Sequence, residues 1–551
     1  MKNVTARLAH GSVFANVRFS LLLIGLLGLV AYSNSLRNEF VWDDVSSVQF
    51  NKHITSPSYI PTIFKSEFHH FGRGQGNFYR PFLTLSFMMD YAVWKLDPKG
   101  YHFTNMLMHI GVAMLVFAVM KGVFQKVSVA LASALLFVVH PIHTQAVTYV
   151  SGRGDMLTNL FLLLSFLLYW LVSAGTDDKA AGERRVRDIA CIIGSILCYV
   201  AALLSKETAI ILPFIVLAGT LIFKERRNRN VWILLGGLFA VMVVYAILRL
   251  TILKFGVAQP TPPLAERLGP ACQAFVTYIR LLLVPVGLHM ERTIDGVSRL
   301  AVIFTIACLV GSCVLIAKQR RDRPGTVFAL SWFLIAWIPI SGIYPLNAAI
   351  AEHWIYLPSI GLFALVVATF ERMITGQQGP FSSKHIRTLA VGIFALILIC
   401  FTGLTMRRNT DWRTNQTLYE STLKYAPNSS RVHYNLGVVY EDQGNKEGAL
   451  KEFLETLRLD PNNAYVRLDI AAIYAEAGDV PRAAGYYIEA IKLSPDDPEI
   501  VEAYMNLGMM YQRSGHTGQA VQLWRKALEL RPDLDVIRGW IAQAQRQGTN
   551  Q

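Results

Sequence analysis

Long apolar stretches alternate with short polar segments over the first three quarters of the chain. They lie at residues 19–35, 104–120, 127–142, 156–173, 189–204, 208–223, 231–248, 299–317, 326–343, 354–370 and 388–406. Helices built from such stretches can cross the roughly 30 Å hydrocarbon core of a bilayer. Only helices and closed barrels satisfy all backbone polar groups there. The pattern predicts an all-α fold with a polytopic helical membrane domain of about eleven spans over residues 1–408.

One further apolar segment, residues 271–288, has an ambiguous pattern because Arg280 lies in its middle and Pro285 near its end. An arginine at mid-bilayer is costly. A crossing here would also move the basic loop at 318–323 to the outside, against the positive-inside rule. We therefore predict an interfacial or re-entrant segment.

The formal net charge of +14 is concentrated in alternate loops between the apolar stretches. Basic residues gather at 121–126, 184–187, 224–229 and 318–323, which the positive-inside rule places in the cytoplasm. The amino terminus is then cytoplasmic and the carboxyl terminus lies on the other side. Arg407 and Arg408 are the exception, because they follow the last stretch on the outer side. Membrane topology thus explains the charge, and no basic–aromatic groove pattern indicates nucleic acid.

After about residue 409 the chain becomes polar and amphipathic, with a fixed period. Gly444, Gly478 and Gly515 are separated by 34 and then 37 residues. Equivalent tyrosines, alanines and prolines keep similar offsets: Tyr440, Tyr474, Tyr511; Ala449, Ala483, Ala520; Pro461, Pro495, Pro532. This period, with glycine at the inter-helix turn and alanine where helices approach, is typical of the tetratricopeptide repeat.

We therefore predict a tetratricopeptide-repeat α-solenoid over residues 409–551, with about three full repeats. A partial leading helix is expected at 412–425 and a capping helix at 534–547. The concave face of such a solenoid usually holds an extended peptide or protein partner. A purely structural cap on the membrane domain is the alternative.

Polar residues that suit chemistry on a lipid-borne substrate gather on the predicted outer side. Asp43 and Asp44 follow the first apolar stretch, where a carboxylate can act as a general base. Arginines and lysines on the same side suit a phosphate group. Structural roles are the alternative, since histidines can bond helix ends, Arg153 and Asp155 can pair, and Lys206 and Arg249 can reach the headgroups.

Several dispersed motifs appear in a characteristic order. They are Val-Trp-Asp-Asp at 41–44, Tyr-Arg-Pro-Phe at 79–82, Tyr-His-x-x-Asn at 101–105, His-Pro-Ile-His-Thr-Gln-Ala-Val at 140–147, Gly-Arg-Gly-Asp at 152–155, Ser-Lys-Glu at 205–207 and Ala-Glu-His-Trp-Ile-Tyr-Leu-Pro-Ser at 351–359. With the trailing repeats, this order resembles the transmembrane and tetratricopeptide-repeat O-mannosyltransferases (TMTC family) and their bacterial relatives. The resemblance covers nearly the whole chain.

The resemblance implies a GT-C glycosyltransferase. Such an enzyme moves a sugar from a polyprenyl-phosphate donor to a protein Ser or Thr hydroxyl on the non-cytoplasmic side. It implies Asp43 or Asp44 as the general base and Arg80, Arg153, Lys206 and Arg249 as donor-phosphate contacts. The remaining pocket residues would be His102, His140, His143, Asp155, Glu207, Glu352 and Tyr356.

Two departures from the family leave the sugar and the acceptor open, so mannose is only the sugar that the family suggests. This chain has His353 where the family commonly has arginine after Ala-Glu, and it is shorter than the animal members. The compact loops favour a bacterial inner membrane with periplasmic repeats. In a eukaryote the same topology would place the repeats in the lumen of the endoplasmic reticulum.

We expect no required cofactor and no metal site, because Asp43 and Asp44 are the only adjacent acids of the motifs and a divalent ion needs several oxygen ligands. A divalent metal stays open, since less similar GT-C enzymes use one. Two other functions remain as alternatives. One is a non-catalytic membrane-anchored scaffold for envelope assembly, and the other is a glycosyltransferase that modifies a glycan or lipid.

Overall fold

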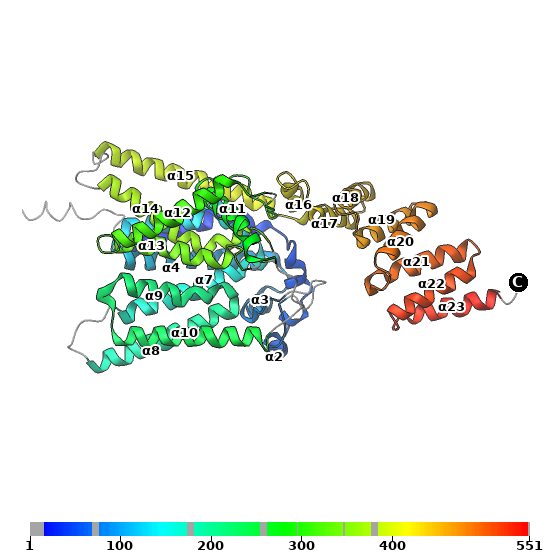
Figure 1. The fold of residues 1–551 in the computed structure, drawn as a ribbon, viewed down its shortest axis with the longest axis horizontal. Coiled ribbons are helices and arrows are strands. Elements are labelled where there is room, and N and C mark those ends of the chain that lie inside the picture. Colours follow the sequence, from blue (N-terminus) through cyan, green and yellow to red (C-terminus); the bar gives the residue numbers. More distant parts are fainter. Residues whose placement is uncertain are drawn as a thin grey trace, which may run out of the picture. The chain divides into compact units, whose positions relative to one another are not determined.

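The computed structural model describes residues 16–68, 77–173, 181–253, 262–294, 296–344, 346, 348–375 and 384–548. Every regular element among them is helical, which confirms the all-α prediction. The chain divides into two compact units, Met1–Thr414 and Asn415–Gln551. Residues 409–414, which we assigned to the repeats, lie in the first unit. Figure 1 shows both units, each of which is described by itself below.

The predicted apolar stretches form the helices of the first unit. In the described part of the chain, eight helices are long and apolar enough to cross a membrane. They are α1 (Val17–Tyr32) with its extension η2 (Ser33–Arg37), α4 (Pro98–Phe124), α7 (Arg153–Ser173), α8 (Ala181–Ser205), α10 (Arg229–Leu250), α12 (Arg299–Gln319), α14 (Tyr356–Thr375) and α15 (Lys384–Asp411).

The other three expected spans are helical but shorter or bent. Helix α5 (Val127–Val139) and the segment Pro141–Val147 meet at 51° and together would make a ninth span. Helices α9 (Leu212–Ile222) and α13 (Pro324–Trp337) belong to shorter apolar segments. The expected number of eleven is therefore reached only if these short helices also cross. The ambiguous segment forms α11 (Leu264–Leu283), which is not among the candidate spans.

The helices of the first unit run side by side (Figure 1). They enclose a core of aromatic and aliphatic side chains. Helix α4 packs against α1, α5 and α7, and α13 packs against α14. Trp332 is fully buried and contacts the rings of Phe166 and Phe328 edge-on, at centroid distances of 5.6 and 5.9 Å. By contrast, only 17% of the apolar window in α12 is buried inside the protein, as expected of a helix that faces lipid.

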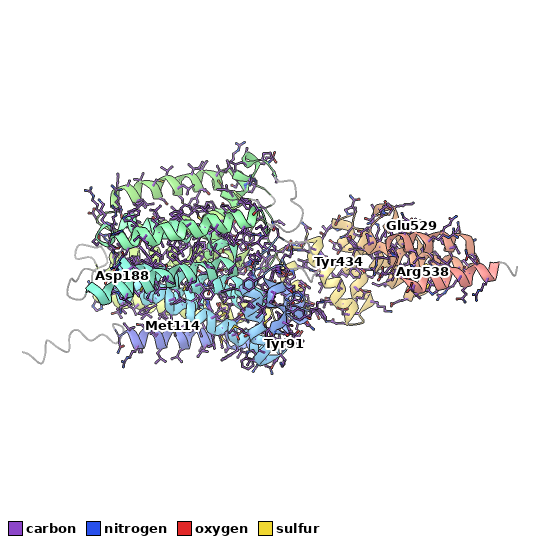
Figure 2. All side chains as sticks on the ribbon, turned by 90° about the horizontal axis from the view of Figure 1, so that it is seen from below. Tyr91, Met114, Asp188, Tyr434, Glu529 and Arg538 are labelled. Carbon is purple, nitrogen blue, oxygen red and sulfur yellow. The ribbon has the colours of Figure 1, made fainter. Side chains whose placement is uncertain are left out.

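The candidate motifs lie at one end of this bundle because consecutive spans run in opposite directions. That end holds the residues after α1, the start of α4, the α5–α7 connection, the end of α8 and the start of α14. In Figure 2, Tyr91 on α3 (Pro81–Trp94) lies at one end of the unit and Asp188 on α8 at the other. The predicted clustering of the motifs on one face is therefore what the fold produces.

The second unit consists of three helix pairs with an additional helix on each side. The leading helix is α16 (Asn415–Leu423), and the pairs are α17 (Ser430–Asp442) with α18 (Lys446–Leu459), α19 (Ala464–Glu476) with α20 (Val480–Leu493), and α21 (Val501–Arg513) with α22 (Thr517–Leu530). Helix α23 (Asp535–Gly548) follows the last pair. The turn glycines Gly444, Gly478 and Gly515 have φ of 75°, 77° and 82°, a left-handed conformation that favours glycine. The short helix η13 (Pro498–Ile500) accounts for the longer last period.

The paired helices approach most closely at one repeated position. A Cβ built at Gly508 would lie 2.4 Å from Nε1 of the buried Trp524, whereas a Cβ at Gly485 on α20 would meet nothing within 4 Å. The second repeat has Ala471 at the position of Gly508. Tyr487 stands at the position of Trp524 and lies in the same buried cluster as Ala471.

We expect Gly508→Ala to destabilise the repeats by about 1–3 kcal/mol, since overpacking displaces the large Trp524 ring. Gly485→Ala should instead stabilise them by up to about 1 kcal/mol, because alanine is the better residue in an open helix interior. Thermal unfolding of residues 415–551, followed by circular dichroism, compares the two variants. Equal shifts of the thermal midpoint in the same direction for both variants would contradict the close approach of Gly508 to Trp524.

Candidate active site

The acidic pair lies in a tight turn that leaves the first span. Trp42 has φ of 55°, a left-handed conformation that is rare for a residue with a side chain. The turn is followed by a π-helical turn, η3 (Val45–Gln49). Both features are uncommon and occur preferentially at functional sites. The local backbone therefore supports the choice of this turn as a candidate site.

Asp44 is fully buried and joins the turn to the segment before α7. Its Oδ1 accepts hydrogen bonds from the Ser151 backbone N–H (2.7 Å) and hydroxyl (2.6 Å). Its Oδ2 accepts from the N–H groups of Val41 (3.3 Å) and Val150 (3.2 Å). Burial raises the pKa of Asp44 to about 7, and these four donors oppose the rise. Both carboxylate oxygens of Asp44 thus bond protein groups, which holds the turn against the segment at 150–151.

Asp43 has a different environment, because it is only half-buried and has one strong partner. The Tyr149 hydroxyl donates to its Oδ2 at 2.7 Å. Burial, and then the two neighbouring carboxylates, raise the pKa of Tyr149 well above its usual value, so Tyr149 remains a donor. Among the two acids, Asp43 is therefore the one with a carboxylate oxygen available to a substrate hydroxyl.

An aromatic stack holds Tyr149 in place. The ring of Tyr149 lies between Trp42 and Trp412, with centroid distances of 5.4 Å to each and interplanar angles of 24° and 29°. Trp412 follows α15 directly and is fully buried. Offset stacking of this kind contributes about 0.5–1.5 kcal/mol per pair beyond burial. The stack connects the acidic turn after the first span to the end of the last span.

Arg153 is buried inside the protein and has its own partners. Its Nη2 donates to Asp90 Oδ2 at 2.5 Å and its Nε to Asn105 Oδ1 at 2.6 Å. Its side chain has no exposed surface, and further donors bond the backbone of Ser86 and Tyr101. This geometry favours a structural role for Arg153 over the predicted phosphate contact. The sequence offered Asp155 as the structural partner of Arg153, but Asp155 pairs with Lys206, and the acid that Arg153 contacts is Asp90.

Two further ion pairs lie at the end of α8. Arg80 makes a bidentate pair with Glu207, with N–O distances of 2.6 and 3.2 Å. Lys206 Nζ bonds both oxygens of Asp155, at 2.7 and 2.8 Å. Arg80 also interacts electrostatically with Asp155, so the two pairs form one cluster. The structure thus brings four predicted site residues together, each cation next to an acid.

A third cluster surrounds Glu352 at the start of α14. Its Oε1 accepts from the His289 N–H (2.6 Å) and from Arg292 Nη2 (3.0 Å). Its Oε2 lies 3.6 Å from Arg408 Nη2, which is an ion pair beyond hydrogen-bond range. Arg408 also pairs with Asp411 at 2.8 Å and lies over the Trp412 ring. This cluster therefore adjoins the aromatic stack.

The predicted histidines and Tyr356 lie inside the bundle and bond other protein groups. His140 contacts the Leu282 carbonyl at 3.1 Å, and His143 contacts the Phe137 carbonyl at 2.8 Å and the Ser359 hydroxyl at 3.1 Å. The Tyr356 hydroxyl lies 2.7 Å from His109 Nδ1. The structure thus favours the alternative weighed from the sequence, in which histidines bond helix ends. His102 is buried on α4 against the backbone of the loop at 38–39.

Among the described residues, Arg249 makes no ion pair with the acids of the three clusters. Its Nη2 donates to the backbone oxygen (2.6 Å) and side-chain oxygen (3.2 Å) of Asn77, in an exposed position. Within the described residues, no group of three His, Cys, Asp or Glu is placed to hold a metal ion. Independence from metal stays a prediction.

Sequence reasoning missed Tyr149, Arg292, Arg408 and Trp412 as site residues. Arg408 had a usable signal, because an arginine that breaks the positive-inside rule at the end of a span is a functional candidate. Trp412 follows the same span, where an aromatic residue is expected at the membrane interface. Arg292 lies in a loop, and no sequence pattern there could have identified it as a site residue.

Comparison with known proteins agrees with the fold. The tetratricopeptide repeat family model matches residues 430–463 and 460–533. The chain is 26% identical over 557 residues to the Homo sapiens protein O-mannosyl-transferase TMTC3, covering 94% of this chain and 56% of that protein. It is 27% identical to the Caenorhabditis elegans protein O-mannosyl-transferase F38B6.6, covering 79% of this chain and 62% of that protein. The resemblance to the TMTC family is thereby confirmed.

This chain spans little more than half the length of the curated relatives that it matches. Among solved structures, the Archaeoglobus fulgidus oligosaccharyltransferase in its apo form is similar with a TM-score of 0.42 and 15% identity. That match covers 71% of this chain and 56% of the oligosaccharyltransferase chain. The crystal structure of MamA matches with a TM-score of 0.23 and 22% identity, covering 27% of this chain and 84% of MamA.

The environment of Asp44 predicts a specific pH dependence of stability. Its folded pKa of about 7 exceeds the ordinary value of 3.8, so the folded protein binds an extra proton between these two pH values. Stability from this group is present at low pH and falls as pH rises toward 7, by up to about 1.4 kcal/mol per pH unit. Asp44→Asn removes this titration.

We therefore expect the stability of the wild-type protein relative to Asp44→Asn to decrease between pH 5 and pH 7.5. Apparent thermal midpoints of both proteins, measured in the same detergent, test this difference. Other titrating groups are the same in both proteins, so their effects cancel when the two midpoints are subtracted. A difference that is constant or grows with pH would show that Asp44 is not buried as described.

Proposed function

We propose that this chain is an integral-membrane glycosyltransferase that moves a sugar from a polyprenyl-phosphate donor to a protein Ser or Thr hydroxyl on the non-cytoplasmic side. The observation that carries the proposal is the half-buried Asp43, oriented by Tyr149 at the end of a membrane bundle where three clusters of paired charges meet. The names of the similar proteins favour mannose as the sugar. The proposal includes a GT-C fold and no required metal.

The chemistry needs one base and one stabilised leaving group. The acceptor oxygen forms a bond to the anomeric carbon of the sugar, and the bond from that carbon to the phosphate oxygen breaks. Asp43 takes the hydroxyl proton, and the phosphate leaves on the polyprenol with the electron pair. A positioned base contributes about 10²–10⁴ in rate. Cationic groups that stabilise the leaving phosphate supply a further share.

The two acids have separate roles in this proposal. Asp43 is the general base, because it retains an oxygen that no described residue engages. Asp44 is a positioning residue, because its four hydrogen bonds fix the turn against the segment at 150–151. This division replaces the open choice between them that the sequence left.

The repeats favour a protein acceptor or a protein partner. Stacked helix pairs form an extended surface that usually holds polypeptide. A glycan or lipid acceptor would have no evident use for that surface. Mass spectrometry of hexose-modified membrane and secreted proteins, in cells with and without this chain, would identify both the sugar and the acceptor class.

Substitution of Asp43 tests the proposed reaction. Asp43→Asn keeps the hydrogen bond from Tyr149 and should lower sugar transfer from a polyprenyl-phosphate sugar at least about 10²-fold, because an amide cannot take the proton. The matched control is Glu39→Gln, which removes an exposed acid four residues away. The measurement is transfer of radiolabelled sugar to protein by purified protein in lipid nanodiscs.

The thermal midpoint of Asp43→Asn should match the wild type, so that a loss of transfer reports chemistry. Undiminished transfer by Asp43→Asn would reject the assignment of the base. Absence of transfer by the wild type, together with a cellular phenotype that depends only on residues 415–551, would favour the scaffold alternative.

The proposed side of the membrane has its own test. A reporter that is active only outside the cytoplasm, fused after the last residue, should be active, because the expected eleven spans are an odd number and the amino terminus is expected in the cytoplasm. The same reporter fused at Asp322, in a basic loop, should be inactive. The opposite result would place Asp43 on the cytoplasmic side and exclude the proposed topology.

A further inference from the structure

Several buried polar atoms without a hydrogen-bond partner lie in one region of the first unit. In the described residues they include Arg408 Nε and Nη2, Trp412 Nε1, Glu352 Oε2, His353 Nδ1 and Gln145 Nε2. These residues come from α15 and the turn after it, from η12 (Glu352–Ile355) and from α6 (Thr144–Val147). Helix α6 packs against both α15 and η12. The atoms named here are therefore neighbours in the fold, whereas other buried atoms without a hydrogen bond, such as Tyr245 Oη on α10 and Arg267 Nε on α11, lie elsewhere in the unit.

Burying several polar atoms without hydrogen bonds in one region lowers the stability of the protein unless a bound ligand supplies the missing hydrogen bonds. A buried polar group left without a hydrogen bond costs about 1–3 kcal/mol, and a charged one costs more. Arg408 is the clearest case, because its side chain is 5% exposed and only its Nη1 has a hydrogen bond. The clusters around Lys206 and Arg80 differ, since their cations already make short bonds to Asp155 and Glu207.

The unpaired atoms are mainly N–H donors, which identifies the chemistry of a ligand. Arg408 offers Nε and Nη2 of a planar guanidinium, of which Nη2 also forms the 3.6 Å ion pair with Glu352, and Trp412 adds an indole N–H. Planar guanidinium donors match the oxygens of a phosphate group in bidentate geometry. Arg280, Arg292 and Arg408 all act electrostatically on the buried His289, so three arginines lie near this residue. The carboxylates of Glu352 and Asp411 hold two of these arginines in position.

The location also connects this region to the acidic turn. Arg408 lies 5.7 Å from the ring centroid of Trp412, which stacks on Tyr149, the donor to Asp43. Arg408 lies in the last turns of α15, a candidate membrane span. A phosphate at the end of a span and one aromatic stack away from the base is where a lipid-borne leaving group would be needed.

We propose that Arg408 and Trp412, supported by Arg292 and Glu352, bind the phosphate group of the polyprenyl-phosphate donor and of the polyprenyl phosphate left after transfer. This inference rests on the proposed function for the identity of the lipid. It assigns the phosphate to a site that differs from Arg80, Arg153, Lys206 and Arg249, the residues predicted from the sequence. Arg80 and Lys206 then hold the neighbouring helix ends through their acid partners.

Binding of the lipid product tests the site without requiring sugar transfer. The probe is a long-chain polyprenyl phosphate added to the full-length protein in nanodiscs, with the uncharged polyprenol and inorganic phosphate as comparison ligands. Native mass spectrometry measures the bound fraction. We expect the wild type to bind polyprenyl phosphate at least tenfold more tightly than polyprenol.

The variants separate the proposed site from its neighbours. Arg408→Gln should weaken polyprenyl-phosphate binding at least tenfold, and Arg408→Lys should restore only part of it, because lysine keeps the charge but not the planar donors. Arg407→Gln is the matched control, since Arg407 is the adjacent arginine on the same helix and is exposed. It should bind as the wild type does. Arg80→Gln should change binding less than Arg408→Gln.

A second variant covers the case in which Arg408→Gln does not fold. Trp412→Phe keeps an aromatic ring in the stack and removes only the indole N–H, and it should weaken polyprenyl-phosphate binding severalfold. Unchanged binding by Arg408→Gln or, if that variant is unfolded, by Trp412→Phe would overturn the site. A larger loss in Arg80→Gln than in Arg408→Gln would also overturn it.

The comparison ligands decide the source of the phosphate. Inorganic phosphate that displaces the lipid at equal concentration would show a site for free phosphate and overturn the assignment to a lipid. If the wild type binds polyprenyl phosphate through Arg408 but transfers no sugar, the proposed function fails while the site stands. If transfer and lipid binding both survive Arg408→Gln, the site fails while the function stands.

Discussion

The need to pair every charge at the end of a membrane bundle determines the arrangement of this site. Each pair joins different elements: Arg80 precedes α3 and Glu207 follows α8, while Arg153 on α7 contacts Asp90 on α3. Breaking one partner of a buried pair typically costs about 3–5 kcal/mol. The pairs therefore fix the helix ends relative to one another. These pairs also help to position the acidic turn. Arg153 donates to Asn105, and Asn105 in turn donates to the carbonyl of Val147, two residues before Tyr149.

The same arrangement separates the two adjacent aspartates. Asp44 is satisfied by two backbone N–H groups of the segment before α7 and by the hydroxyl of Ser151, so it acts as a connector. Asp43 points to a tyrosine whose ring is fixed by stacking. One residue of a pair thus positions the turn, and the other is left for chemistry. The strained backbone at Trp42 is consistent with this division, since strain persists only where surrounding contacts enforce it.

Sequence patterns predicted the elements better than their contacts. Apolar length and the glycine period located the spans and the repeats, because both depend on local composition. The face on which the motifs meet also followed, since it depends only on the alternation of spans. The partners of Arg153 and Lys206 did not follow, because a pair such as Arg153–Asp90 is made across the bundle between residues 63 positions apart. Helical periodicity carries no information about such a contact.

Arg408 shows how a departure from the positive-inside rule can indicate a functional site. Its position after the last span opposes the positive-inside rule, and charge statistics alone treat it as a defect in the topology. In the structure it is buried against Glu352, Asp411 and the Trp412 ring, and its Nε and Nη2 make no hydrogen bond. A buried arginine that is held by two acids and still has donors without a hydrogen bond has a cost that anchoring does not explain. A bound oxyanion accounts for both its burial and its unpaired donors.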